Sequence, residues 1–443
     1  MTASAVNGQY RRGKTFLFLI ACSWAGAAPH WIEPSRSLFP AITLAFLLGG
    51  YGLRIILLRD RETSGINSNV GTLPLISQES LPNVDVLVAA RDEEAVVQRL
   101  VEHIDSLDYP QSKISTWIID DGSVDQTPVI LEELRRKFHN LQVINRSTSA
   151  GGGKSGALNQ ALKEIKGEWI LILDADAQLQ KDSLHRLVSY AIKGGWSAVQ
   201  LRKAVVNSAH NQLTRFQAME MAMDMVIQQG RLASGGVVEL RGNGQLILRS
   251  ALDQCGGFNE GTVTDDLDLS FRLLISRALV GILWDPPVQE EGVETVHALW
   301  RQRKRWAEGG LQRFFDYWSF LVSSRLPVSQ RIDLGCFFLL QYALPVVSCA
   351  DLATTVLTKT MPVYWPLSII AFTISGLAYW RGCNTIGEGP SLPSPKPIRL
   401  VMAIIYLLHW FLVIPWVTLR MAFLPKKFVW LKTNHYGQEA LKI

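Results

Sequence analysis

Several acidic side chains in this chain directly follow short apolar segments, an arrangement that suits metal binding. The clearest case is Asp174-Ala-Asp176, which ends the apolar segment 169–173. In an extended segment residues i and i+2 point the same way, so both carboxylates can face one divalent cation. Oxygen ligands of this kind suit Mg²⁺ or Mn²⁺, with substrate phosphates completing the coordination shell. Asp174 and Asp176 are therefore the predicted metal ligands.

A second acidic pair, Asp120 and Asp121, follows the apolar segment 116–119. Carboxylates at a strand end can accept hydrogen bonds from a uracil base or a ribose. The residues after them, Gly122–Asp125, are explained by a tight turn and a helix cap. That structural explanation does not account for two adjacent acids directly after an apolar strand. We therefore predict that Asp120 and Asp121 bind a nucleotide.

The glycine-rich segment Gly151–Gly156 admits two interpretations. It matches the G-x-G-x-x-G dinucleotide pattern and has acidic residues about 20 positions downstream, which leaves an NAD(P)-binding membrane oxidoreductase as a remote alternative. However, several loop residues separate it from the preceding strand, and Thr148 replaces the first glycine of a P-loop. The simpler interpretation is a flexible loop that places Lys154 near a diphosphate and opens a helix containing Asn159.

A third acidic cluster, Thr264-Asp-Asp-Leu-Asp268, precedes the helical segment 269–275. Acids at a helix start complement the helix dipole, and this is sufficient to explain Asp268. Asp266 could in addition serve as a general base that takes a proton from an acceptor hydroxyl. We therefore predict a catalytic role for Asp266.

Downstream of these acids, three residues with complementary chemistry share one face of a predicted helix: Gln302, Arg305 and Trp306. An arginine can pair bidentately with a pyrophosphate. A tryptophan ring suits the face of a sugar or a lipid glycerol. The alternative is an interfacial helix with basic and aromatic faces, and one segment can serve both purposes.

The segments that position these residues alternate between strand and helix from about residue 84 to 284. This alternation is typical of a mostly parallel, Rossmann-like α/β sheet covered by helices. In such sheets ligands bind beyond the carboxyl ends of the strands, where the acids lie. The expected strands are 84–90, 116–120, 141–145 and 169–173, and the expected helices are 91–107, 125–138 and 155–165.

Five apolar runs flank this α/β region, and each approaches or exceeds the ~20 residues needed to span a bilayer. They are Thr15–Trp31, Leu38–Leu58, Leu334–Leu357, Val363–Trp380 and Leu400–Leu424. Nothing amphipathic accompanies them, which disfavours buried helices of a soluble core. The sequence therefore predicts an integral, multi-pass membrane protein.

Basic residues orient these segments, because cytoplasmic flanks are enriched in Lys and Arg. They precede the first run and close the second, which places residues 60–330 in the cytoplasm. Five crossings would leave a basic C-terminal segment outside, against the same rule. Either Pro415 marks a re-entrant segment or one late crossing is miscounted. The basic residues concerned are Arg11, Arg12, Lys14, Arg54, Arg59 and Arg61 near the N-terminus, and Lys426, Lys427 and Lys432 near the C-terminus.

Composition narrows the function further. A net charge of +5 over 443 residues suits an anionic membrane face or an anionic substrate and is too small to indicate nucleic acid. The five cysteines lie far apart without metal-ligand spacing, so a zinc site is not expected.

Taken in order, the motifs DDGSxD, GKxxALN, DAD, TDD and QxxRW resemble those of the membrane-bound family 2 glycosyltransferases. The resemblance covers roughly residues 80–320. It implies a GT-A fold and transfer with inversion at the anomeric carbon. By position, the resemblance implies that the nucleotide sugar is bound by Asp120, Asp121, Lys154 and Asp174, and the metal by Asp174 and Asp176. It implies that Asp266 is the catalytic base, with Asp265 beside it. The diphosphate and the acceptor would be contacted by Gln302, Arg305 and Trp306.

Within this family, the segment Arg305–Trp318 most resembles members that glucosylate membrane lipids. That likeness implies glucose transfer from UDP-glucose to 1,2-diacylglycerol, at the cell or thylakoid membrane if the source is cyanobacterial. A processive β-glycan synthase is the alternative, although Arg241-Gly-Asn-Gly244 departs from the cysteine-containing loop common in polymer synthases. The expected division is 1–60 membrane hairpin, 61–300 catalytic domain, 301–330 interfacial helix and 331–443 membrane region.

Overall fold

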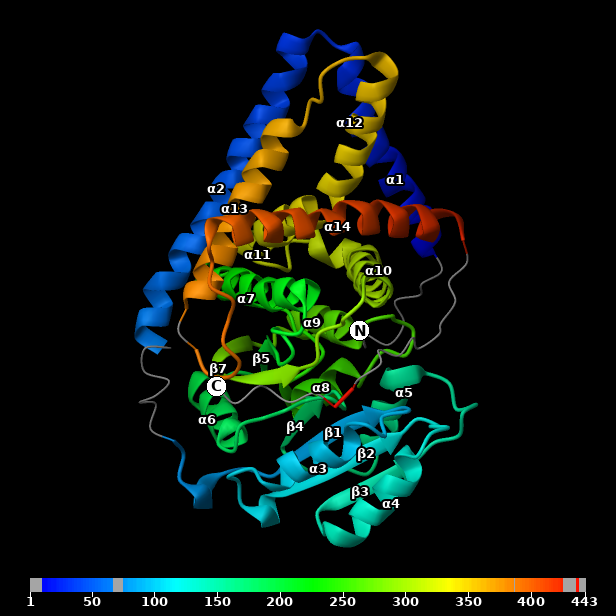
Figure 1. The fold of residues 1–443 in the computed structure, drawn as a ribbon, viewed down its shortest axis with the longest axis vertical. Coiled ribbons are helices and arrows are strands. Elements are labelled where there is room, and N and C mark those ends of the chain that lie inside the picture. Colours follow the sequence, from blue (N-terminus) through cyan, green and yellow to red (C-terminus); the bar gives the residue numbers. More distant parts are fainter. Residues whose placement is uncertain (1–9, 67–74, 386, 425–435, 438–443) are drawn as a thin grey trace.

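The computed structural model describes residues 10–66, 75–385, 387–424 and 436–437. An α/β domain forms its lower half, and long helices form the upper part (Figure 1). Seven strands make one sheet in the order β3-β2-β1-β4-β6-β5-β7. Only β6 runs antiparallel to its neighbours, so the predicted mostly parallel sheet is confirmed. The strands are β1 (Val84–Ala90), β2 (Ile114–Asp120), β3 (Leu141–Asn145), β4 (Trp169–Leu173), β5 (Ala198–Val205), β6 (Gln245–Leu248) and β7 (Val280–Glu290).

The inner strands β1 and β4 are buried at every position, as expected for a sheet with helices on both faces. Their apolar runs are therefore continuous and do not alternate. The helices of this domain are α3 (Val97–Asp105), α4 (Thr127–Lys137), α5 (Gly153–Ala161), α6 (Ser183–Gly194), α8 (Arg249–Cys255) and α9 (Asp265–Ile275). The helix expected over 91–107 begins only at Val97, because residues 91–96 form a turn after β1.

Two helices connect the sheet to the upper part of the molecule: α7 (Gln212–Ala233) and α10 (Val296–Leu321). Both begin at a side-chain cap, Asn211 for α7 and Thr295 for α10. A Cβ at Gly230 of α7 would lie 2.2 Å from the carbonyl oxygen of Ile55, so this glycine lets α7 pack directly on α2. The sequence predicts one interfacial helix over 301–330. In the structure the helix α10 ends at Leu321, and the side chains of its second half are largely buried.

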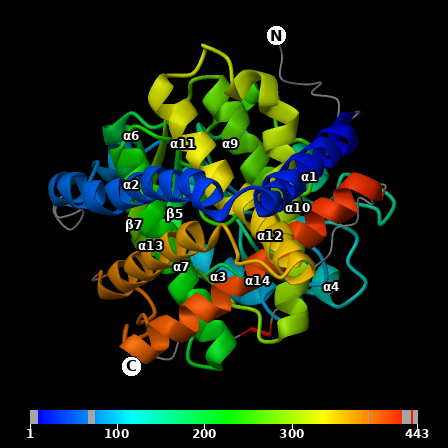
Figure 2. The same cartoon turned by 90° about the horizontal axis from the view of Figure 1, so that it is seen from above.

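The upper helices form two hairpins and one crossing helix (Figures 1 and 2). The tips of the hairpins are tied together, because His30 Nε2 lies 2.8 Å from Asp351 Oδ1. The first hairpin is α1 (Arg11–Ala27) with α2 (Pro34–Ile66). The second is α11 (Val328–Phe338), a π-helical turn (Leu339–Ala343) and α12 (Leu344–Thr358), returning through α13 (Trp365–Asn384); α14 (Pro397–Phe423) crosses below both.

Among the described residues, three helical stretches are long and apolar enough to cross a membrane, namely Arg36–Leu58, Val328–Thr358 and Pro397–Phe423. They flank the α/β domain in the sequence. Two of the five predicted runs, which correspond to α1 with 17 residues and α13 with 20, do not meet the same criteria of length and composition. Lys426, Lys427 and Lys432 lie outside the described residues.

Candidate active site

One cavity of about 430 Å³ collects most of the predicted site residues. It lies beyond the carboxyl end of β4, between the sheet and the upper helices. Its polar end draws side chains from α5, the end of β4, α9 and α10, which are far apart in the sequence. The predicted residues that line it are Lys154, Asp174, Asp176, Asp265, Asp266, Gln302, Arg305 and Trp306.

The Asp-Ala-Asp motif is held on both sides. Asp174 accepts a hydrogen bond from Lys154 Nζ at 2.6 Å, and its backbone N–H donates to Asn243 at 3.1 Å. Asp176 accepts from the backbone N–H of Glu291 at 2.8 Å. Burial by itself would raise the pKa of Asp174, but Lys154 outweighs this and lowers it. The carboxylate is therefore ionised near neutral pH.

These two carboxylates fit a hard divalent cation that takes its remaining ligands from a nucleotide diphosphate. Both side chains line the cavity, and carboxylate oxygens with substrate phosphates are the usual ligands of Mg²⁺. Within the described parts of the chain, no three His, Cys, Asp or Glu side chains converge as a complete metal-binding group. A protein site with only two carboxylates depends on its substrate for the rest of the shell.

Asp120 and Asp121 do not line this cavity but lie at the neighbouring end of β2. Asp120 accepts from the hydroxyl of Ser123. Asp121 pairs with Arg146, whose guanidinium also donates to the carbonyl of Gly151 at 2.7 Å. Sequence reasoning missed Arg146, which ties the acidic pair to the glycine loop. Gly151 and Gly152 adopt φ of +70° and +71°, a conformation that favours glycine.

Asp266 lies at the start of α9, beside the glycine of the Arg241-Gly-Asn-Gly244 loop. A Cβ built on Gly242 would lie 3.5 Å from Asp266 Oδ2, which is ordinary van der Waals contact, so this loop packs directly against the carboxylate. Burial, and then the charge of Asp265, raise the pKa of Asp266 to about 6. A carboxyl group with this pKa is a stronger base than an ordinary aspartate and is still ionised at neutral pH.

The helix α10 presents Gln302, Arg305 and Trp306 to the cavity, as predicted from their shared face. The ring of Trp306 lies 4.0 Å from the guanidinium carbon of Arg303 and 5.7 Å from Lys203 Nζ. Both basic residues were missed by sequence reasoning. Lys203 also pairs with Glu290 at 2.8 Å.

Arg303 is fully buried, and Glu220 of α7 is its ion-pair partner. Glu220 also accepts from Tyr406 at 2.7 Å and Trp410 at 3.0 Å, both on α14. An arginine can be buried only if its charge is paired and its donors are largely satisfied. This cluster therefore fixes α10, and with it Trp306, against two other helices.

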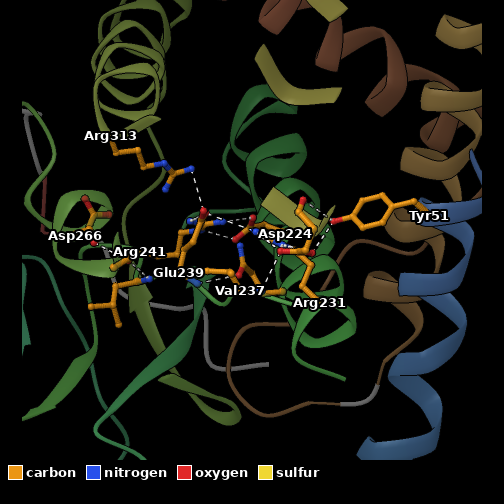
Figure 3. A network of polar contacts seen from close by, with 12 residues as sticks. Tyr51, Asp224, Arg231, Val237, Glu239, Arg241, Asp266 and Arg313 are labelled. Atoms are coloured by element: carbon orange, nitrogen blue, oxygen red, sulfur yellow. Dashed lines mark hydrogen bonds and ion pairs between the residues drawn. The ribbon is translucent and has the colours of Figure 1, made fainter. Parts of the chain in front are cut away.

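A second buried network, drawn in Figure 3, lies between Asp266 and α2. Its centre is Glu239, which is 0% exposed and lies 3.1, 3.7 and 3.0 Å from Arg313, Arg231 and Arg241. Burial alone would raise the pKa of Glu239, but the three guanidinium groups outweigh it and lower the pKa to about 2. This carboxylate therefore stays ionised at any physiological pH.

The outer partners of this network connect it to the upper helices. Arg241 also pairs with Asp224 at 2.9 Å, and Arg231 pairs with Asp333 at 2.8 Å. Tyr51 of α2 donates to Asp333 at 2.7 Å. The loop that lies against Asp266 is thus joined through ion pairs to α7, α10 and α11, and the Tyr51 hydrogen bond extends the network to α2 (Figure 3).

Beyond this network the cavity continues into an apolar chamber between the upper helices. Its walls come from α2, α7, the π-helical turn with α12, α13 and α14. A single continuous cavity therefore has a charged end beside the sheet and an apolar end among helices that could cross a membrane. The apolar lining includes Gly52, Ile55, Ile56, Met223, Met225, Ile227, Leu340, Leu344, Pro345, Ala371, Phe372, Ile374, Leu407 and Phe411.

A family model described as glycosyltransferase like family 2 matches residues 82–309, just over half of the chain and nearly all of the α/β domain. The chain belongs to glycosyltransferase family 2. It is therefore a glycosyltransferase, and the NAD(P)-dependent alternative is set aside. Gly151 and Gly152 precede α5, and Lys154 lies in the first turn of that helix, so the glycine segment opens a helix as the simpler interpretation predicted.

Among members of this family, two proteins named beta-monoglucosyldiacylglycerol synthase are similar over most of their length. The protein from Synechocystis sp. is 46% identical over 80% of this chain and 75% of its own. The protein from Trichormus variabilis is 41% identical over 97% of this chain and 90% of its own. A poly-beta-1,6-N-acetyl-D-glucosamine synthase from Staphylococcus epidermidis is 27% identical, over 56% of this chain and 60% of its own.

A solved structure supports the fold. A mannosyltransferase from Pyrobaculum calidifontis, in complex with GDP-Man and Mn²⁺, superposes with a TM-score of 0.58 at 18% identity. The match covers 86% of this chain and 99% of that one. The predicted GT-A-like fold of the family 2 domain, flanked by candidate membrane helices, is confirmed.

Proposed function

We propose that this chain transfers glucose from UDP-glucose to 1,2-diacylglycerol with inversion, giving β-monoglucosyldiacylglycerol. The observation that carries the proposal is the continuous cavity. Its charged end suits a nucleotide diphosphate, and its apolar end, among helices that could cross a membrane, suits acyl chains. The similarity to two beta-monoglucosyldiacylglycerol synthases supports the identity of donor and acceptor.

The reaction is a single displacement in this proposal. Asp266 accepts the proton of the glycerol hydroxyl as that oxygen forms its bond to the anomeric carbon. The bond from that carbon to the diphosphate oxygen breaks on the opposite face, and its electron pair leaves with UDP. Lys154 and Arg305, both in the cavity, stabilise the negative charge on the leaving diphosphate.

A divalent cation, Mg²⁺ or Mn²⁺, is the proposed cofactor, held by Asp174 and Asp176. It would supply positive charge beside the diphosphate when bound. Asp120 and Asp121 are proposed to bind the nucleoside, since they end the strand next to β1 at the same edge of the sheet. Gln302 and Trp306 are proposed to contact the diphosphate and the sugar or glycerol, because both line the cavity.

The proposed location is a cell or thylakoid membrane, with the catalytic domain in the cytoplasm. The basic residues that flank the first hairpin in the sequence support this side. We also propose the division into a hairpin at 1–60, a catalytic domain at 61–300, a connecting segment at 301–330 and a membrane region at 331–443. Residues 301–330 include most of α10, which joins the sheet to the upper helices.

The test is to incubate membranes containing the chain with labelled UDP-glucose, UDP-galactose or UDP-N-acetylglucosamine. Label from UDP-glucose in a chloroform-soluble glycolipid, dependent on added diacylglycerol, is the expected result. Label in insoluble polymer would instead indicate a processive synthase. The Asp266→Asn chain in the same membranes is the matched control and should incorporate label at least about 100-fold more slowly into either fraction.

A further inference from the structure

Helix α14 qualifies as a membrane span by length and composition, but its direction in the molecule differs from that of the hairpin helices. In Figure 1 the helices α1, α2, α12 and α13 run along the long axis, and α14 lies across it. The view from above agrees, since α14 is seen there along its length (Figure 2). A helix of 27 residues is about 40 Å long. If the hairpins cross the bilayer, α14 lies in its plane.

The segment before α14 is bound to the catalytic domain. The carboxylate of Glu388 pairs with Arg186 at 2.9 Å, and its carbonyl accepts from Arg202 at 2.7 Å. Its backbone N–H donates to Asp285 at 2.9 Å. Arg186, Arg202 and Asp285 all belong to the α/β domain. The N-terminal end of α14 is therefore on the catalytic side.

The other end of α14 is bound to the same side. Arg420 pairs with Glu308 of α10 at 3.1 Å. Farther along the chain, the backbone N–H of Tyr436 donates to Glu291 at 2.7 Å, directly after β7. A spanning helix would place its far end about 30 Å away, across the hydrocarbon core. Tyr436 could not then lie beside Glu291 unless the chain crossed the membrane again.

The surface of α14 fits the same arrangement. Its outward face is apolar along its whole length, and basic residues lie at both ends, Lys396 and Arg399 at one and Arg420 at the other. A crossing helix would be expected to carry them mainly at its cytoplasmic end. The apolar residues more than a third exposed are Ile398, Val401, Met402, Ile405, Leu408, Leu412, Trp416, Leu419 and Phe423.

We propose that α14 does not cross the membrane but lies along its surface on the catalytic side, with its outward face in the lipid of that leaflet. The partner is a bilayer because this face adjoins hairpin helices that expose apolar residues in the same way, such as Phe46 on α2 and Val356 on α12. An interfacial helix of this kind buries its apolar face at the headgroup and acyl boundary.

Two consequences follow. Without α14, the helices that meet the length and composition criteria are α2 and α11 with α12. In this proposal their shorter or less apolar hairpin partners α1 and α13 cross with them, so the number of crossings is even and Tyr436 lies on the same side as the catalytic domain. The inward face of α14 contributes Leu407, Trp410 and Phe411 to the cavity. A helix seated in the leaflet therefore forms one wall of the reaction chamber.

The side of the C-terminus can be tested by cysteine labelling in the full chain, with its five native cysteines replaced by alanine. Single cysteines are placed at three exposed positions by Val124→Cys in the catalytic domain, Met361→Cys at the tip of the second hairpin and Tyr436→Cys. A membrane-impermeant maleimide is applied to sealed vesicles of both orientations. Tyr436→Cys should label with Val124→Cys, and Met361→Cys should label from the other side. Labelling of Tyr436→Cys together with Met361→Cys would overturn the proposal.

The depth of α14 provides a second test that is independent of enzyme activity. Nitroxide labels at Val401, Leu408, Leu412 and Leu419 lie on its exposed face and should disturb the fold little. An in-plane helix predicts four similar depths, close to the headgroups. A crossing helix predicts that the two central positions are deepest and the outer two shallow. A central maximum would refute the proposal even if the labelling result agreed with it.

Discussion

The raised pKa of Asp266 leads to a prediction about how activity depends on pH. A general base must be ionised to act, so kcat/KM should be half-maximal near the pKa of the free enzyme's base and fall about tenfold per pH unit below it. Burial and Asp265 raise that pKa to about 6. Activity should therefore be nearly constant above pH 7 and fall through pH 6 as the solution is acidified.

Removing the charge of the neighbouring Asp265 tests this explanation of the raised pKa more directly than the pH profile of the parent chain does. The Asp265→Asn substitution removes a negative charge beside Asp266, and a like charge disfavours ionisation. The pKa of Asp266 should then lie between its ordinary value of 3.8 and about 6, because burial still raises it. The acidic limb of the profile should move to lower pH, so the variant should keep a larger fraction of its maximal activity at pH 5 than the parent chain.

The assay is the initial rate of glycolipid formation in detergent micelles across pH 4.5 to 8.5, with donor binding measured separately by calorimetry. The Asp266→Asn chain is the matched control and should lose about 10²–10⁴-fold in kcat while its affinity for UDP-glucose changes little. An acidic limb unmoved by Asp265→Asn, or an Asp266→Asn chain with substantial activity, would refute the assignment of the base.

Three further predictions concern the parts that hold this site. Glu239→Gln should destabilise the chain by about 3–5 kcal/mol, because three arginines lose the buried carboxylate that neutralises them. In a detergent melting curve, the double variant with Arg313→Met should recover part of this loss. Equal melting temperatures for the parent and Glu239→Gln would contradict this explanation. Arg303→Lys keeps the charge paired with Glu220 but loses the planar group against Trp306, so kcat/KM should fall by about tenfold; an unchanged value would show that this contact does not position the ring. Chelation of divalent cations should abolish turnover and Mg²⁺ or Mn²⁺ should restore it, while a chain with both carboxylates of the Asp-Ala-Asp motif changed to Asn should not recover.

Much of the catalytic domain could be predicted from the sequence because its signals are local. The strands at 84–90, 141–145 and 169–173 occur as predicted, since continuous apolar runs between polar turns determine buried strands. The Asp-Ala-Asp motif lies at a strand end for the same reason. The general rule that ligands bind at the carboxyl edge of such sheets predicted where this motif lies, and the resemblance to family 2 glycosyltransferases predicted that Asp266 and Trp306 belong to the same site.

The residues that hold the site in place could not be predicted, because each depends on a partner far away in the chain. Nothing in the sequence distinguishes Arg146 from the other arginines, and only the structure shows that it forms an ion pair with Asp121. The cluster around Glu239 joins residues of α7, α10 and the intervening loop. Only a folded chain shows that these charges are buried together, and burial is what makes them energetically important.

Helix α14 illustrates the same division between sequence and tertiary structure. Its sequence determined a long apolar helix, and nothing in its length or hydropathy separates a crossing helix from one that lies in the plane of the bilayer. The hint in the sequence was that five crossings would leave the C-terminal lysines outside, against the rule that cytoplasmic flanks are basic. The direction of α14 was decided by Glu388 and Tyr436, which bind the catalytic domain on either side of it. Two tethers on one side fix where both ends of a helix lie, and that information exists only in the tertiary structure.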